Sequence, residues 1–157
     1  MLLPFFEWCE TLWLGQFVVG SNWLFPVIES VHLLASALLG GSIFLVDFRL
    51  LGLGLKDRAV AELARDARPW MIAGVVTMIL TGIPLFLSEP VKCYYSTAFW
   101  IKMTTLPIAL GFAFTVRAQV TRAQPAGKTA RGQKLVGALS IALWFTVAAA
   151  GRWIGFS

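Results

Sequence analysis

The apolar run 22–51 places the strongest constraint on what this chain can fold into. It is long enough to cross a bilayer, because ~20 residues rising ~1.5 Å each cover the ~30 Å hydrocarbon core. Between Trp23 and Val46 it carries only two ionisable side chains, Glu29 and His32. The sequence therefore predicts that this run is a transmembrane helix.

Polar and small residues follow one face of this predicted helix. Steps of three or four residues along that face give the series Glu29, His32, Ser36, Gly40, Ile43 and Asp47. His32 is the only histidine of the chain. Ionisable groups are costly in a bilayer and normally face a protein interior or a cavity, so we expect this face to meet other helices of the same chain.

The composition is that of a polytopic membrane protein. The chain of 157 residues is 58% hydrophobic and only 13% charged, whereas about 25% of residues are charged in soluble proteins. This length allows a single domain with about four spans. The net charge of +5 arises from basic residues near helix ends, so we expect a lipid bilayer as partner and no nucleic acid.

The predicted fold is all-α, with four transmembrane helices in an antiparallel bundle that occupies residues 1–157. The spans are expected at about 22–51, 69–87, 98–116 and 135–154. A separate surface helix, capped by Asp57, is expected before the second span. Residues 1–20 are predicted to form a short interfacial helix with one apolar face, made of Phe5, Trp8, Cys9, Leu12 and Trp13.

The basic residues predict the orientation of the bundle. Ten of the thirteen lie in or beside the first and third loops: Arg49, Lys56, Arg58, Arg65, Arg68, Arg117, Arg122, Lys128, Arg131 and Lys134. Both loops should be cytoplasmic by the positive-inside rule, so both termini should lie outside. Four candidate site residues then share the outer half of the bundle: Glu29, His32, Lys102 and Arg152.

His32 is the residue on which a cofactor hypothesis depends. A neutral imidazole in a helical bundle is a common ligand of heme iron or copper. The second ligand would be Lys102, a methionine such as Met78 or Met103, a tyrosine, water, or His32 of a partner subunit in a homo-oligomer. Glu29 could reach across to orient the ligand, and Arg152 could pair with a heme propionate near the outer surface.

Other interpretations of the same residues stay open. A lone histidine in a span is often only a buried hydrogen-bonding residue, and Lys102 and Arg152 could simply extend toward the interface. In a non-enzymatic partner subunit or small-solute carrier, Glu29 and His32 would form a polar lock with Lys102 or Arg152. The sequence does not decide whether the chain is an enzyme.

Two further pairings are suggested by the charges and the cysteines. Asp47 and Arg49 are two residues apart and do not face each other, so we expect Asp47 to pair with Arg68 or Arg117 on a neighbouring helix. Cys9 and Cys93 form no CxxC motif, and a disulfide between them would require that both face an oxidising side.

Four short motifs carry a family resemblance over nearly the whole chain. They are Glu-Ser-x-His at 29–32, Asp-x-Arg at 47–49, Phe-x-x-Lys at 99–102 and Gly-Arg-x-Ile at 151–154. With them, the chain resembles an uncharacterised family of short bacterial inner-membrane proteins, known only as a domain of unknown function. This resemblance implies a multi-pass protein of the bacterial inner membrane and no established activity.

A more distant resemblance points to a cofactor. The placement of His32 and Lys102 is similar to that in four-helix membrane protoporphyrinogen oxidases, which bind heme b. The copper-resistance D family has a related His-Leu then Gly-Gly pattern. The chain lacks the dense basic and histidine content of the oxidases, so the resemblance implies heme binding through His32 rather than porphyrin oxidation. The expectation is a membrane redox module for electron transfer to a partner protein.

Overall fold

The computed structural model describes residues 2–55, 57–122 and 131–156, and these ranges contain helices without strands. Four helical segments are long and apolar enough to cross a membrane. They are α3 (Leu24–Leu51), α4 (Val60–Ser88), the continuous segment of α6 (Thr97–Phe112), η1 (Ala113–Arg117) and α7 (Ala118–Arg122), and α8 (Arg131–Ile154). The predicted all-α, multi-pass membrane fold is thereby confirmed.

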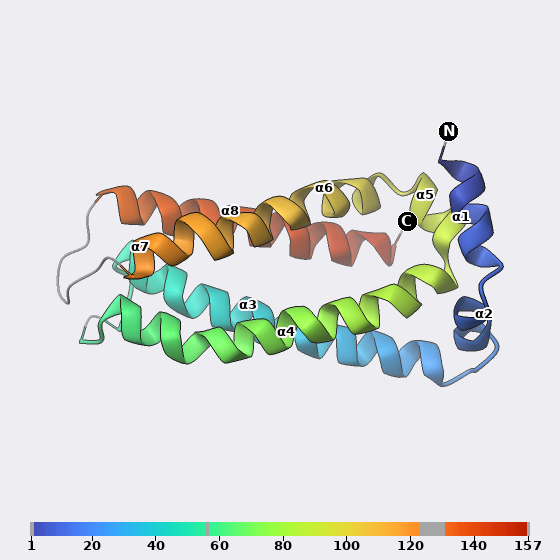
Figure 1. The fold of residues 1–157 in the computed structure, drawn as a ribbon, viewed down its shortest axis with the longest axis horizontal. Coiled ribbons are helices and arrows are strands. Elements are labelled where there is room, and N and C mark those ends of the chain that lie inside the picture. The colour runs from blue at the N-terminus through green and yellow to red at the C-terminus, as the bar shows by residue number, and fades with distance from the viewer. Residues whose placement is uncertain (1, 56, 123–130, 157) are drawn as a thin grey trace.

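The four spans lie side by side along the long axis of the molecule (Figure 1). Helix α3 packs against α4 and α8, and α6 packs against α8. Both chain termini lie at one end, which we call the terminal end (Figure 1). The opposite end, where α3 and α7 finish and α4 and α8 begin, is called the loop end. His32 lies in the first third of α3 and therefore in the half of the bundle nearer the terminal end.

The core of the bundle is apolar and tightly packed at its centre. Its buried members come from all four spans: Leu39, Ile43, Met71, Ala109, Ala113, Trp144 and Val147. Gly74 permits the close contact of α4 with α3, because a Cβ there would lie 2.9 Å from the Cβ of Leu39. Many large apolar side chains point outward instead, as expected for helices that contact lipid.

The boundary between the first loop and the second span differs from the prediction. Helix α4 runs through Pro69 without ending, so the expected surface helix and span form one helix, and its N-cap is Ala59 rather than Asp57. A proline inside a helix removes one backbone hydrogen bond. Leu63, Ala67 and Met71 nevertheless keep one continuous buried face on both sides of Pro69, and this packing offsets the loss.

The N-terminal segment forms two helices rather than the single one predicted. Helix α1 (Leu3–Glu10) and helix α2 (Trp13–Val19) are separated at Leu12, which has extended backbone angles. Both lie across the terminal end of the bundle (Figure 1). The chain turns here because α1 packs on the short helix α5 (Pro90–Tyr95), while α2 packs on α4.

This packing also changes which face of the N-terminal segment is buried. Phe6 and Cys9 are buried, whereas Phe5, Trp8 and Trp13 of the predicted apolar face are exposed. Phe6 joins a cluster with Cys93 and Phe99 at the terminal end. Cys9 and Cys93 are both buried and both free.

Candidate functional site

His32 lies on α3 about 12 Å from the start of the helix, half-buried against α4. Its Nδ1 is 2.7 Å from Oγ1 of Thr81, and that hydroxyl donates a hydrogen bond to the Thr77 carbonyl oxygen at 2.7 Å. When its single proton is donated to the Thr77 carbonyl oxygen, the Thr81 hydroxyl accepts from Nδ1–H of the imidazole. Nε2 is then the unprotonated nitrogen, with its lone pair available to a ligand.

Further contacts between α3 and α4 surround His32. The hydroxyl of Ser36 is 2.8 Å from the His32 carbonyl oxygen and 2.9 Å from the Met78 sulfur. A Cβ at Gly82 would lie 3.4 Å from Cε1 of the imidazole, so this glycine lets the α4 backbone come close to the ring. The ring itself is therefore contacted from α4, by Thr81 and Gly82, whereas Ser36 bonds to the His32 backbone and to Met78.

Lys102 is half-buried on α6 and contacts α8. Its Nζ is the atom nearest to a Cβ built on Gly151, at 3.4 Å. The Lys102 ammonium acts electrostatically on both His32 and Cys93, which places it with the imidazole in the terminal half of the bundle. Across residues 2–55, 57–122 and 131–156, Lys102 makes neither a hydrogen bond nor an ion pair.

Glu29 and Arg152 are not drawn into this group. Glu29 is exposed and has no hydrogen bond or ion pair with any residue that the structure describes. A three-residue step on a helix turns the side chain by about 60°, so His32 can meet α4 while Glu29 does not. Arg152 is exposed too, and its guanidinium lies 4.5 Å from the centre of the Phe156 ring.

The two cysteines are poorly suited to be ligands or nucleophiles. Burial raises the pKa of the Cys93 thiol to about 11; Glu89 adds to this increase, while Lys92 and Lys102 oppose it. Burial also raises the pKa of Cys9. Because thiolates rather than thiols bind metals and attack electrophiles, both side chains are inert near neutral pH.

A second polar cluster lies toward the loop end. Nε of Arg117 donates to Oδ1 of Asp47 at 2.7 Å, and Nη2 donates to the Ile43 carbonyl oxygen at 3.2 Å. Both charged side chains are buried. The predicted partner of Asp47 is thus confirmed as Arg117, the alternative to Arg68. Arg117 ends the π-helical segment η1, a kind of turn that is frequent at functional sites.

Sequence reasoning missed two members of this second cluster, Ser140 and Trp144 of α8. Both are buried, as are Gly137 and Val147 on the same helix face. The steps of three, four and three residues that join these four positions were a usable signal, because they place a serine on the buried stripe of an apolar span. The importance of Thr81 was missed as well, since threonine is common in spans and forms no motif.

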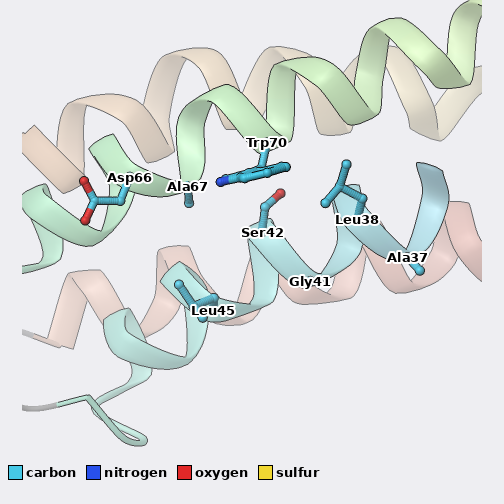
Figure 2. Close-up of a pocket in the computed structure, with 8 residues that line it drawn as sticks. All are labelled: Ala37, Leu38, Gly41, Ser42, Leu45, Asp66, Ala67 and Trp70. Carbon is cyan, nitrogen blue, oxygen red and sulfur yellow. The ribbon is translucent and has the colours of Figure 1, made fainter. Parts of the chain in front are cut away.

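A groove on the outside of the α3–α4 pair is separate from both clusters. It has a volume of about 410 Å³, and eight residues line it, Ser42 and Trp70 among them (Figure 2). The Ser42 hydroxyl is already bonded to the Leu39 carbonyl oxygen of its own helix at 2.8 Å. None of the eight lining residues is a histidine or a cysteine, so the groove offers no metal ligand of the kind that His32 provides.

The described residues also contain no group of three or more His, Cys, Asp and Glu side chains arranged to hold a metal ion.

A family model described as a family of unknown function (DUF6644) matches residues 5–157 of the chain. No curated protein and no solved structure matches the sequence.

Proposed function

The chain belongs to the DUF6644 family of unknown function, and we propose that it is a heme-binding redox module of the membrane in which Nε2 of His32 is an axial ligand of heme b. The observation that carries this proposal is the hydrogen bond between His32 Nδ1 and Thr81, at 2.7 Å. Ligating histidines nearly always donate their other ring N–H to a fixed acceptor, which sets the tautomer and the orientation of the ring. The resemblance to four-helix membrane protoporphyrinogen oxidases that His32 and Lys102 suggest in the sequence leads to the same hypothesis.

The donor set of the site fits a heme better than a bare metal ion. A structural zinc or copper ion needs three or four protein ligands, and no group of three acidic, histidine or cysteine side chains exists among the described residues. The porphyrin of a heme supplies four ligands itself, so one histidine and one further group complete the coordination. His32 is half-buried rather than enclosed, so part of the residue remains accessible.

Each of the remaining residues would have a separate role toward the heme. Thr81 holds the imidazole in the tautomer that leaves Nε2 free. The Lys102 amine is the candidate second ligand, because it is unpaired among the described residues and lies in the same half of the bundle. Arg152, with Glu29 at the same end, would remain at the surface and pair with a propionate. One-electron redox chemistry would come from the heme iron when bound.

The proposal includes a location and an orientation. Basic residues gather at the loop end, including Arg58, Arg65, Arg68 and Arg122, and this asymmetry supports a cytoplasmic loop end. The terminal end and His32 would then face the periplasm of a bacterial inner membrane. An electron partner on that side would reach the heme edge from outside.

The visible spectrum of the purified protein tests the function directly. With adequate heme supply during expression, the protein should show a Soret band that His32→Ala abolishes. Lys102→Met should shift the band or alter its redox response while the pigment stays. A wild-type protein that is colourless and takes up no added hemin would refute heme binding and favour a non-enzymatic partner subunit or small-solute carrier.

A further inference from the structure

Three buried polar atoms in the loop half of the bundle have no hydrogen-bond partner among residues 2–55, 57–122 and 131–156. They are Oδ2 of Asp47, Oγ of Ser140 and Nε1 of Trp144. Asp47 and Ser140 are 0% exposed and Trp144 is 5% exposed, so bulk solvent cannot satisfy them. Buried polar groups are nearly always paired with protein atoms or ordered water. We therefore asked which molecule could form hydrogen bonds with these three atoms.

The three residues belong to one region of the α3–α8 interface. The Ser140 hydroxyl lies close enough to the Asp47 carboxylate to stabilise it as a hydrogen-bond donor, but the two groups do not reach the geometry of a formed bond, so both still lack a full partner. Trp144 is one turn from Ser140 on the same face of α8, and it packs in the core cluster with Ile43, one turn before Asp47. Gly137 brings α8 close to α3 here, since a Cβ at this position would lie 3.0 Å from the Asp47 carbonyl oxygen.

The charges and hydrogen bonds already present restrict what can bind. Arg117 neutralises Asp47 through Oδ1, and its Nη2 is directed to the Ile43 carbonyl oxygen. The site therefore has no net charge to attract a second ion. It still needs a donor for Oδ2, an acceptor for the indole N–H, and a partner for the Ser140 hydroxyl. Water offers two protons and two lone pairs in the smallest volume.

We propose that a water molecule is bound inside the membrane-spanning bundle between Asp47, Ser140 and Trp144. It accepts from Nε1–H of Trp144 and donates to Oδ2 of Asp47, while Ser140 is its third partner. The water, with the Asp47–Arg117 pair, connects α3, α8 and the π-helical segment η1. This site is independent of His32 and of the proposed heme.

Magnetisation transfer from water to the tryptophan indole protons tests the proposal. The full-length protein is labelled with ¹⁵N-tryptophan in lipid nanodiscs, and the Trp144 resonance is assigned by its loss in Trp144→Phe. We expect a cross-peak between the Trp144 indole proton and water, and a weaker one in Ser140→Ala, where the water loses a partner. Trp100 serves as the comparison, because its Nε1 donates to the Tyr94 carbonyl oxygen at 2.9 Å and needs no water.

Two results would overturn the water site. One is a Trp144 indole proton without a cross-peak to water, which would mean that the cluster is dry. The other is a cross-peak that Ser140→Ala leaves unchanged, which would place the water elsewhere. Should Ser140→Ala fail to fold, the wild-type Trp144 resonance alone still separates a bound water from a dry cluster.

Discussion

Nε of Arg117 lies 2.7 Å from Oδ1 of Asp47, across 70 positions of sequence and in the interior of the bundle. The two side chains are 6% and 0% exposed. In the protein interior, each buried charge loses its hydration. Only the electrostatic attraction to the other charge offsets this desolvation penalty.

Removing one member of this pair should destabilise the protein strongly. Asp47→Leu or Arg117→Leu should lower the free energy of unfolding in detergent by about 3–5 kcal/mol, because either leaves an uncompensated buried charge. The double variant should recover most of this loss. Arg58→Gln, in the exposed pair with Asp66 at 3.8 Å, should change stability by about 1 kcal/mol or less. A double variant as unstable as the worse single one would contradict the pairing argument.

Replacing the acceptor of the His32 ring should weaken heme binding without removing the ligand. Thr81→Val leaves Nδ1–H without its acceptor, and we expect hemin affinity to fall by about 10–100-fold in a titration followed by absorbance. Thr146→Val is the matched control, because the Thr146 hydroxyl also donates to a carbonyl oxygen one turn back, at 2.8 Å, but is exposed and on another helix. Equal affinities for the two variants would show that Thr81 does not position the ring.

Two helical glycines should respond in opposite ways to alanine. Gly74→Ala brings a Cβ to 2.9 Å from that of Leu39, so α4 must move away from α3. The free energy of unfolding should fall by about 1–3 kcal/mol, and the melting temperature should fall with it. Gly111→Ala meets nothing within 4 Å and should be neutral or stabilising by up to about 1 kcal/mol, because alanine favours the helix. The close α3–α4 contact would be in doubt if Gly74→Ala melted at the wild-type temperature.

The orientation can be checked with a reporter that is active only in the cytoplasm, fused after the C-terminal residue. The positive-inside rule places this end outside, so the fusion should give no signal. A fusion inserted in the chain between α7 and α8 provides the positive control. A strong signal from the C-terminal fusion would reverse the orientation and move His32 to the cytoplasmic half.

The pH dependence of Cys93 follows from its burial outside the spans. Its pKa of about 11 exceeds the ordinary value, so the folded protein keeps the thiol neutral at pH 8. The stability contributed by the neutral thiol is complete below the ordinary pKa, about 8.5, and is lost as pH rises toward 11. Alkylation of Cys93, measured by mass spectrometry, should be slow at pH 8 and accelerate up to about pH 11. The same rate in folded and SDS-unfolded protein at pH 8 would exclude this protection.

Several features could be predicted from the sequence because they depend on local chemistry. Four apolar runs of sufficient length have to be helices in a bilayer, since every backbone polar group must be satisfied within its own segment. Polar and ionisable side chains are costly in lipid, which favours an inward direction for the series on α3; His32, Ser36 and Asp47 turn inward, whereas Glu29 does not. An acidic residue at the position of Asp47 likewise required a basic partner.

Tertiary structure decided which faces and partners meet. Gly74 on Leu39 and Gly137 on Asp47 set the distances of α4 and α8 from α3, and these contacts determine that Asp47 meets Arg117 and that His32 meets Thr81. They also leave Glu29 and Arg152 at the surface. Hydropathy is a property of one segment, whereas helix rotation depends on how several segments pack together, so the sequence determined the spans and only the packed bundle determined their pairings.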